Sequence, residues 1–172
     1  MSVNVTGPKP AAKGSLSAPN PLFLRDEELI RGVELLDFAY RGLLAEPDRR
    51  LAASGLGRNH QRILHFVGRE PGITMTRLLD LLQLTKQSLS RLVRELEAQG
   101  ALARRPDPRD RRQLRLELTG RGRELDEHVN GRLRRRLADA YRAAGAEAVA
   151  GYHKVLLGLL DERARRRLHA GR

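Results

Sequence analysis

The stretch that decides the fold runs from Thr74 to Thr119 and reads TMTRLLDLLQLTKQSLSRLVRELEAQGALARRPDPRDRRQLRLELT. Its first half predicts two short helices. Thr74 is suited to cap a helix of two turns, and Thr85 is suited to cap a second helix from Lys86 to Gln99. Gly100 follows as a residue that favours a left-handed C-terminal cap. Two short helices separated by a tight turn form a candidate helix-turn-helix.

The second half of the stretch changes from a helical period to a period of two. Residues 114–118 alternate Leu with Arg and Glu, as expected for a half-buried strand. Residues 102–105 are the predicted partner strand. Pro106 and Pro108 lack backbone N–H donors, so strand pairing should end there. Residues 107–112 are then the projecting tip of a hairpin.

Helical patterns also precede this stretch. Apolar residues at helical spacing predict a helix over 24–46, ended by Pro47, and a short helix is expected near 48–53. A second main helix should end before Pro71. Residues 1–21 are rich in Pro, Gly and Ser without an apolar period, which predicts a disordered tail.

Two further helices are predicted after the stretch, a long one from Thr119 to the break at Gly145 and a last one carrying Val149 to Leu160. Their apolar stripes, and that of the first helix, exceed what one small domain can cover, which predicts a partner chain. We therefore expect a mainly α fold with a small β-hairpin. Its four segments are a tail (1–21), an N-terminal helical dimerisation segment (22–56), a winged helix-turn-helix (57–119) and C-terminal dimerisation helices (120–172).

Composition narrows the class of partner. The 172 residues suffice for one compact domain, and 33 Lys and Arg against 21 Asp and Glu give a net charge of +12, which indicates a polyanionic partner. No aromatic residue lies between Phe66 and Tyr141, so the basic centre has no rings for stacking unpaired bases. Duplex DNA is therefore favoured. The lack of Cys excludes disulfides, thiolate zinc sites and cysteine nucleophiles, and no apolar run is long enough to span a membrane. We expect a cytoplasmic protein.

The helix from Lys86 to Gln99 has two distinct faces. One is apolar, and the other carries side chains that pair with base edges, because Arg binds guanine and Gln binds adenine in the major groove. The simpler interpretation is a solvated face on a surface helix. The apolar face comprises Leu89, Leu92, Val93 and Leu96, and the polar residues opposite or flanking it are Gln87, Ser90, Arg91 and Arg94, with Ala98 beside them.

The hairpin tip is strongly basic. Between Arg104 and Arg115, six arginines stand against two aspartates, a local excess of four positive charges. Minor grooves concentrate negative potential and attract inserted Arg, so such a tip fits a second groove beside the helix. The alternative is a solubilising loop with internal Asp–Arg pairs.

These features together resemble the winged helix-turn-helix of the MarR family. The wing motif D-x-R-D-R-R, followed by a Leu-Thr that opens the next helix, matches residues 107–112 and 118–119. The resemblance extends over residues 22–168. Within the family, FLRDEELIRGVELL (23–36) and TKQSLSRLVRELEAQG (85–100) are most similar to the PetP-type subgroup. The sequence departs from the family pattern at Leu79 and Gln83, where an Ala and a small residue or Gly are expected.

The resemblance implies a homodimeric transcription regulator that binds a pseudo-palindromic operator and represses or activates according to the operator's position. The second helix would enter the major groove and the wing the adjacent minor groove. The expected recognition-helix residues are Thr85, Lys86, Gln87, Ser88, Ser90, Arg91 and Arg94. The expected wing contacts are Arg105, Arg109 and Arg111, and the expected bracing residues are Asp107, Asp110 and Arg112.

The sequence shows no pattern typical of a catalytic or metal-binding site. Ser88 and Ser90 have no matching His and Asp arrangement, and there is no Gly-rich phosphate loop, so we expect no enzyme activity. We also expect no cofactor and no metal site, because the histidines lack the i, i+4 spacing of a helix-borne metal pair. Several relatives sense a small-molecule effector in a crevice, and His65 could lie there. The main alternative function is a non-specific basic architectural protein associated with DNA or RNA; a membrane-surface role for residues 163–167 is weaker, because aromatic anchors are lacking.

Overall fold

The computed structural model describes residues 21–108, 110–111 and 113–169 and divides the chain at Tyr40 into two compact units. The first unit contains a short 3-10 helix, Leu22–Leu24, and the start of helix α1, which runs from Asp26 to Ala53. Acidic residues fill the first turn of α1, where the helix dipole favours negative charge. The predicted disordered tail falls, apart from Pro21, outside the described residues.

The end of α1 corrects the sequence prediction. Pro47 was expected to end the helix at residue 46, with a separate short helix near 48–53, but α1 continues through Pro47 to Ala53 as one helix. A proline inside a helix removes one hydrogen bond and crowds the preceding turn. Here the Pro47 ring is buried, and it lines a pocket with residues of a later helix. Tertiary packing therefore outweighs the local preference to break.

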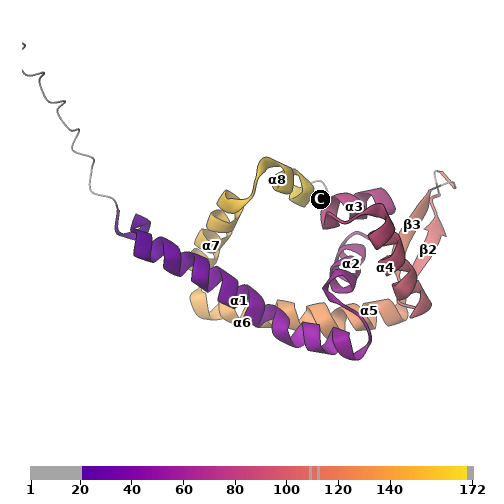
Figure 1. Cartoon of the computed structure of the whole chain (residues 1–172), viewed down its shortest axis with the longest axis horizontal. Helices are drawn as coiled ribbons and strands as arrows, with labels where there is room; N and C mark the ends of the chain where they lie inside the picture. The colour runs from indigo at the N-terminus through magenta and orange to yellow at the C-terminus, as the bar shows by residue number, and fades with distance from the viewer. Residues whose placement is uncertain (1–20, 109, 112, 170–172) are drawn as a thin grey trace, which may run out of the picture. The chain divides into compact units, whose positions relative to one another are not determined.

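The core of the second unit lies among α2 (Arg58–Arg69), α3 (Met75–Leu82) and α4 (Lys86–Ala98). Figure 1 shows these three helices gathered at one end of the unit, with the strands beside α4. Each helix turns an apolar face inward, as its sequence period predicts. The fully buried side chains include Ile63, Leu64, Val67, Leu78, Leu82, Leu89, Val93 and Leu96.

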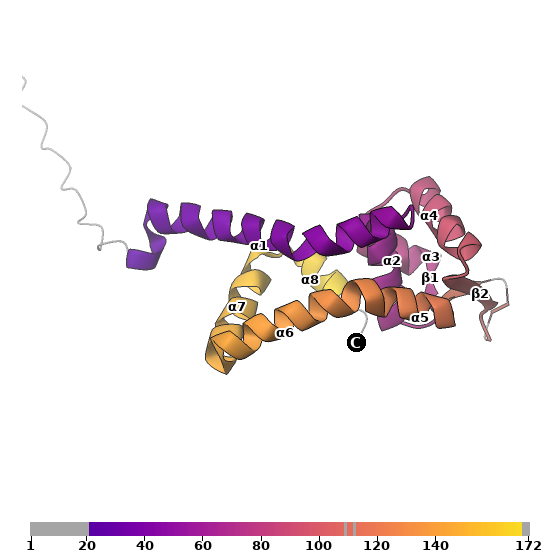
Figure 2. The ribbon, with the colours of Figure 1, turned by 90° about the horizontal axis from the view of Figure 1, so that it is seen from below.

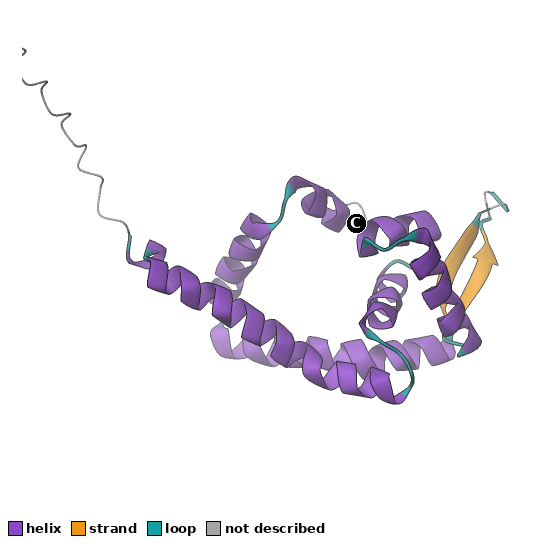
Figure 3. Cartoon of the chain, viewed as in Figure 1, coloured by secondary structure: helices purple, strands orange, loops and turns teal. Residues whose placement is uncertain are grey.

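A three-stranded antiparallel sheet, ordered β1–β3–β2, completes this unit. Strand β2 spans Leu102–Pro106 and pairs along its whole length with β3, Leu114–Leu118, so the predicted hairpin is confirmed and ends at Pro106. The sequence analysis missed β1, Ile73–Thr74, which pairs with the middle of β3. Two residues are too few to show a period of two. Strands β2 and β3 are drawn in orange in Figure 3, and the described part of the chain has no strands besides these two and β1.

The long helix after Thr119 is built from three parts. Thr119 caps α5 (Gly120–Asp126) by accepting a hydrogen bond from the backbone N of Gly122, a π-helical turn follows over Glu127–Gly131, and α6 spans Arg132–Ala144. The parts run in line in Figure 2. Near the turn, the buried Gln61 side chain donates to Oδ1 of Asn130 at 3.0 Å.

The last predicted helix is in fact two helices, α7 (Ala146–Leu159) and α8 (Glu162–His169). Leu160 was expected within a single helix, but its extended backbone separates the two. Helix α8 contacts α3, because Nε of Arg167 donates to Oδ1 of Asp80 at 3.0 Å and Nη2 of Arg77 donates to the Arg167 carbonyl at the same distance. These contacts could not be read from the Arg-rich sequence of α8. The expected fold class, mainly α with a winged helix-turn-helix, is confirmed.

Candidate nucleic-acid interface

Helix α4 begins where the sequence predicts. The Thr85 hydroxyl accepts a hydrogen bond from the backbone N of Ser88 at 3.2 Å and donates to the Ser88 hydroxyl at 2.9 Å. The predicted apolar face of α4 is entirely buried. Among the polar residues named from the sequence, Ser88 and Ser90 are half-buried, and those exposed are Thr85, Lys86, Gln87, Arg91 and Arg94. The helix therefore presents a continuous polar surface with hydrogen-bonding side chains.

The turn between α3 and α4 depends on Gln83. This residue is in the left-handed conformation, with φ of 56° and ψ of 41°, and it is the one described residue other than glycine with a positive φ. Its side-chain amide donates to the Asp80 carbonyl at 2.7 Å, which satisfies a group at the end of α3. The departure from the family's small residue is thus accommodated, and the helix-turn-helix still closes.

Two arginines of α4 interact with groups of the same helix. Nη1 of Arg91 lies 3.0 Å from Oε1 of Glu95, one turn later, and Nε of Arg94 donates to the Ser90 carbonyl at 3.2 Å. A hydrogen bond from His60, with a smaller contribution from Arg91, holds the pKa of Glu95 below its usual value. Arg91 is 66% exposed, so its guanidinium remains accessible to an incoming ligand.

The hairpin places further arginines beside α4, which contacts β2. Arg105 is exposed on β2, with Nε 3.9 Å from Oε2 of Glu117, and Arg111 is exposed in the turn between the strands. Asp110, also in this turn, accepts a hydrogen bond from the backbone N of Gln113 through its carbonyl at 2.9 Å. The predicted residues Arg109 and Arg112 lie outside the described residues.

Near its turn, the hairpin is braced by Arg115, a residue that the sequence analysis did not select as a bracing residue. Asp107 is only 4% exposed, and its Oδ2 accepts a hydrogen bond from Nε of Arg115 at 2.6 Å. Arg115 had been counted only as part of the basic charge. An acidic residue after one strand facing an Arg on its partner is the signal that could have identified this pair.

The described residues were also compared with the requirements of a metal site and of a membrane-spanning helix. In the described ranges, no three His, Cys, Asp or Glu side chains are grouped so as to hold a metal ion. Burial lowers the pKa of His65, which favours its neutral form. None of the described helices combines the length and the apolar character needed to cross a membrane.

Comparison with known proteins identifies the family. A model of the MarR family matches residues 54–113, which include the helix-turn-helix and the first strand and turn of the hairpin but end just before β3. The HTH-type transcriptional regulator PetP of Rhodobacter capsulatus is 44% identical over 156 residues, covering 91% of this chain and 94% of that protein. The chain belongs to the MarR family. As a MarR-family member, it is a transcriptional regulator with a winged helix DNA-binding fold.

Solved MarR-type structures agree with this fold. The Streptococcus pneumoniae protein FabT, crystallised in complex with DNA, superposes with a TM-score of 0.64 at 21% identity, covering 76% of this chain and 94% of FabT. The Mycobacterium tuberculosis MarR family protein Rv2887, in complex with p-aminosalicylic acid, superposes with a TM-score of 0.52 at 25% identity. That match covers 74% of this chain and 96% of Rv2887.

Proposed function

We propose that this MarR-family regulator binds a pseudo-palindromic operator in duplex DNA as a homodimer. The observation that carries the proposal is the division of α4 into a buried apolar face and an exposed polar face, beside a basic hairpin. A major groove admits one α-helix, and a narrow minor groove attracts Arg. Helix α4 then enters the major groove while the hairpin enters the adjacent minor groove.

Within α4, Gln87, Arg91 and Arg94 are the proposed base contacts, since each is exposed and has a side chain long enough to reach a base edge. The residues around the start of the helix, Thr85, Lys86, Ser88 and Ser90, are proposed to bind phosphates or nearby bases. In the wing, Arg105, Arg109 and Arg111 are the proposed minor-groove and phosphate contacts. Asp107, Asp110 and Arg112 are the proposed bracing residues.

The proposed dimer is supported by apolar surface at both ends of the chain. In the first unit, Leu29, Val33 and Leu36 are between 46% and 70% exposed. In α7, Val155 and Leu159 are 64% and 66% exposed. Exposed apolar surface of this extent supports an interface with another chain. Deleting residues 147–172 should abolish dimerisation and operator binding, and a truncated protein that still sediments as a dimer would refute the assignment of α7 and α8 to the interface.

Operator binding is tested in two steps. Mapping bound sites across the genome identifies the operator, and fluorescence anisotropy then compares that duplex with a scrambled duplex of the same composition. We expect the operator to bind at least about a thousandfold more tightly, as is typical of specific DNA-binding proteins. Equal affinity for both duplexes would instead identify the non-specific architectural protein, the second candidate, which the charge of +12 favours.

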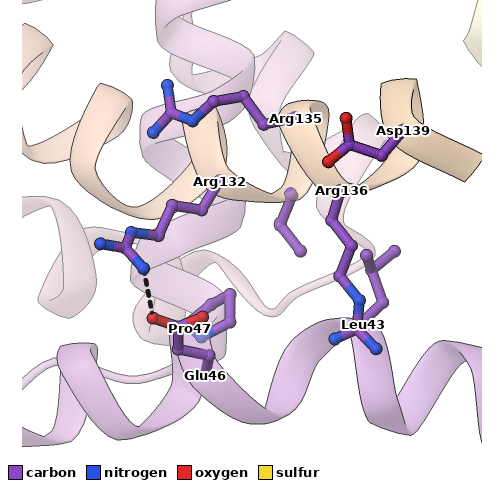
Figure 4. A pocket seen from close by; sticks show the side chains of 8 residues that line it. Leu43, Glu46, Pro47, Arg132, Arg135, Arg136 and Asp139 are labelled. Atoms are coloured by element: carbon purple, nitrogen blue, oxygen red, sulfur yellow. Dashed lines mark hydrogen bonds and ion pairs between the residues drawn. The ribbon is translucent and has the colours of Figure 1, made fainter.

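We also propose that a small anionic effector modulates operator binding. A pocket of about 280 Å³ lies between α1 and α6, and in it Arg132 pairs with Glu46 at 2.6 Å. Figure 4 shows the side chains that line this pocket. Arg135, Arg136 and Asp139 also line it, so the lining has three arginines and two carboxylates, an excess of one positive charge. Because Rv2887 binds p-aminosalicylic acid, that compound is the first probe. It should release the wild-type protein from its operator at lower concentration than the Arg132→Ala variant, whereas release of both at the same concentration would contradict this location.

A further inference from the structure

Glu95 of α4 has two partners on two different elements. Its Oε1 lies 3.0 Å from Nη1 of Arg91, and its Oε2 lies 2.7 Å from Nε2 of His60 at the start of α2. Helices α2 and α4 contact each other in the core of the second unit (Figure 1). One carboxylate therefore joins an exposed arginine of α4 to a buried residue of the neighbouring helix.

The geometry of His60 fixes which atom donates. Its Nδ1 accepts a hydrogen bond from the backbone N of Gly57 at 2.9 Å, so the proton of the neutral ring is on Nε2 and is donated to Glu95. The ring is only 6% exposed and is bonded at both nitrogens, which leaves it little freedom to rotate. Oε2 of Glu95 is thereby anchored, and Oε1 is left facing Arg91.

A second contact joins α4 to the same part of the chain. The side-chain amide of Gln99, at the end of α4, donates to the carbonyl of Ser54, just after α1. The connection between α1 and α2, Ser54 to Gly57, is thus bonded both to Gln99 and, through His60, to Glu95.

We propose that Glu95 is a positioning residue for sequence readout: anchored by His60, it orders the Arg91 side chain before DNA is bound. This inference rests on the proposed function, in which Arg91 contacts a base. A free arginine loses rotamer freedom when it binds, and this loss of side-chain entropy opposes binding. Ordering Arg91 in advance removes part of that cost and limits the positions its guanidinium can take.

The variant Glu95→Gln distinguishes two possible effects of Glu95: the ordering of the Arg91 side chain and the repulsion of DNA by a negative charge. The amide oxygen still accepts from His60, but the amide nitrogen cannot accept from Arg91. Removal of a negative charge near DNA should, by electrostatics alone, tighten binding to every duplex. If Glu95 orders Arg91, the variant should instead lose specificity. The ratio of operator affinity to scrambled-duplex affinity should then fall about 3- to 10-fold per half-site.

The matched control is Glu97→Gln, which removes the same charge from the same helix but breaks a pair with Arg104, at 2.8 Å, instead of the pair with Arg91. We expect this control to keep the wild-type affinity ratio. His60→Gln gives an independent arm, because Gln at this helix position retains an acceptor for the Gly57 N–H while losing the fixed ring. His60→Gln should lower the ratio of operator affinity to scrambled-duplex affinity, as Glu95→Gln does. Thermal melting of each variant confirms that it is folded.

Anisotropy titrations of the full chain on operator and scrambled duplexes measure all three variants, alone and with Arg91→Ala. With Arg91 removed, Glu95→Gln should have no further effect on the ratio. The proposal is overturned if Glu95→Gln leaves the ratio unchanged, lowers it no more than Glu97→Gln, or raises it, in which case Glu95 holds Arg91 away from DNA. If Arg91→Ala alone leaves the ratio unchanged, the proposed contact of Arg91 with a base fails as well.

Discussion

The guanidinium of Arg115 ties Asp107 to a segment that precedes the helix-turn-helix. Its Nε donates to Oδ2 of Asp107 at 2.6 Å, and its Nη1 donates to the Gly72 carbonyl at 3.0 Å. Arg115 itself pairs with Thr74 of β1 and Arg105 of β2. One side chain in the central strand therefore links the turn end of the hairpin to the segment before α3, in addition to the backbone pairing of β3 with β1.

Asp107→Ala should destabilise the fold by about 1–3 kcal/mol, because it leaves the Arg115 guanidinium without its charged partner. Urea unfolding monitored by circular dichroism measures this difference. Glu117→Gln is the control, since the 3.9 Å pair with Arg105 is exposed and should contribute no more than about 0.5 kcal/mol. Equal stability of Asp107→Ala and the wild-type protein would show that the hairpin does not depend on this pair.

Arg111→Ala and Arg91→Ala should impair DNA binding in different ways. Loss of Arg91 should cost about 1–3 kcal/mol on the operator and relax preference at one or two symmetric positions, as for a bidentate base contact. Loss of Arg111 should weaken binding to many sequences and flatten the slope of log K against log salt by about 0.9 per arginine, or twice that per dimer. Any sequence preference lost with Arg111 should be confined to the A·T-rich flanks of the site.

Both variants are measured by anisotropy at several salt concentrations on operator and scrambled duplexes. If Arg111→Ala changed neither the salt slope nor the operator affinity, the hairpin would be only a solubilising loop. If Arg91→Ala weakened both duplexes equally, Arg91 would contact phosphate and not a base.

Gln83→Ile should destabilise the protein by about 1–2 kcal/mol, because a β-branched residue is strained at the positive φ of this turn. Gln83→Asn should lie within about 0.5 kcal/mol of the wild-type protein, since Asn tolerates the left-handed conformation. Thermal unfolding of both variants tests the difference. The conformation described for Gln83 would be incorrect if Ile were tolerated as well as Asn.

The acid stability of the protein should depend on Glu127. Hydrogen bonds from Arg135 and Arg134, both at 2.6 Å, hold the pKa of Glu127 below its usual value. A lowered pKa in the folded state stabilises the fold fully at pH values above the ordinary Glu pKa of about 4.3, and this stabilisation is lost as the pH falls through the folded-state pKa.

Glu127→Gln should therefore be less stable than the wild-type protein at pH 6 and approach it as the pH is lowered to about 3. Urea unfolding at pH steps between these values measures the gap. A gap that stays constant over this range would mean that the carboxylate charge makes no contribution.

Elements with a strong local signal were predicted well from the sequence. Thr74, Thr85 and Thr119 each cap the helix that follows, and the alternation of residues 114–118 marks a real strand. In each case the deciding interaction joins neighbours in the sequence or repeats along one element. The apolar face of α4 was also predicted completely, because burial on one side of a helix leaves a regular period.

The features that were missed depend on residues far apart in the chain. Helix α1 passes through Pro47 because the ring is buried beside α6, and β1 exists only because β3 lies next to it. In the candidate site, the polar residues of α4 were identified in advance, whereas the Asp107–Arg115 and His60–Glu95 pairs were not. Such pairs require the hairpin and the α2–α4 packing to be known first.

The π-helical turn at Glu127–Gly131 has a consequence for the phase of the helix that contains it. The stripe Leu125, Val129, Leu133, Leu137, Tyr141 advances by four residues at each step, so in an unbroken α-helix it would rotate by about 40° per step and wind away from a flat partner. A π turn takes up one extra residue, which resets the phase by about 100°. The apolar stripe can then stay on one side of the helix along its whole length. At the same time α5 contacts α2 at one end of this helix, and α6 contacts α7 at the other.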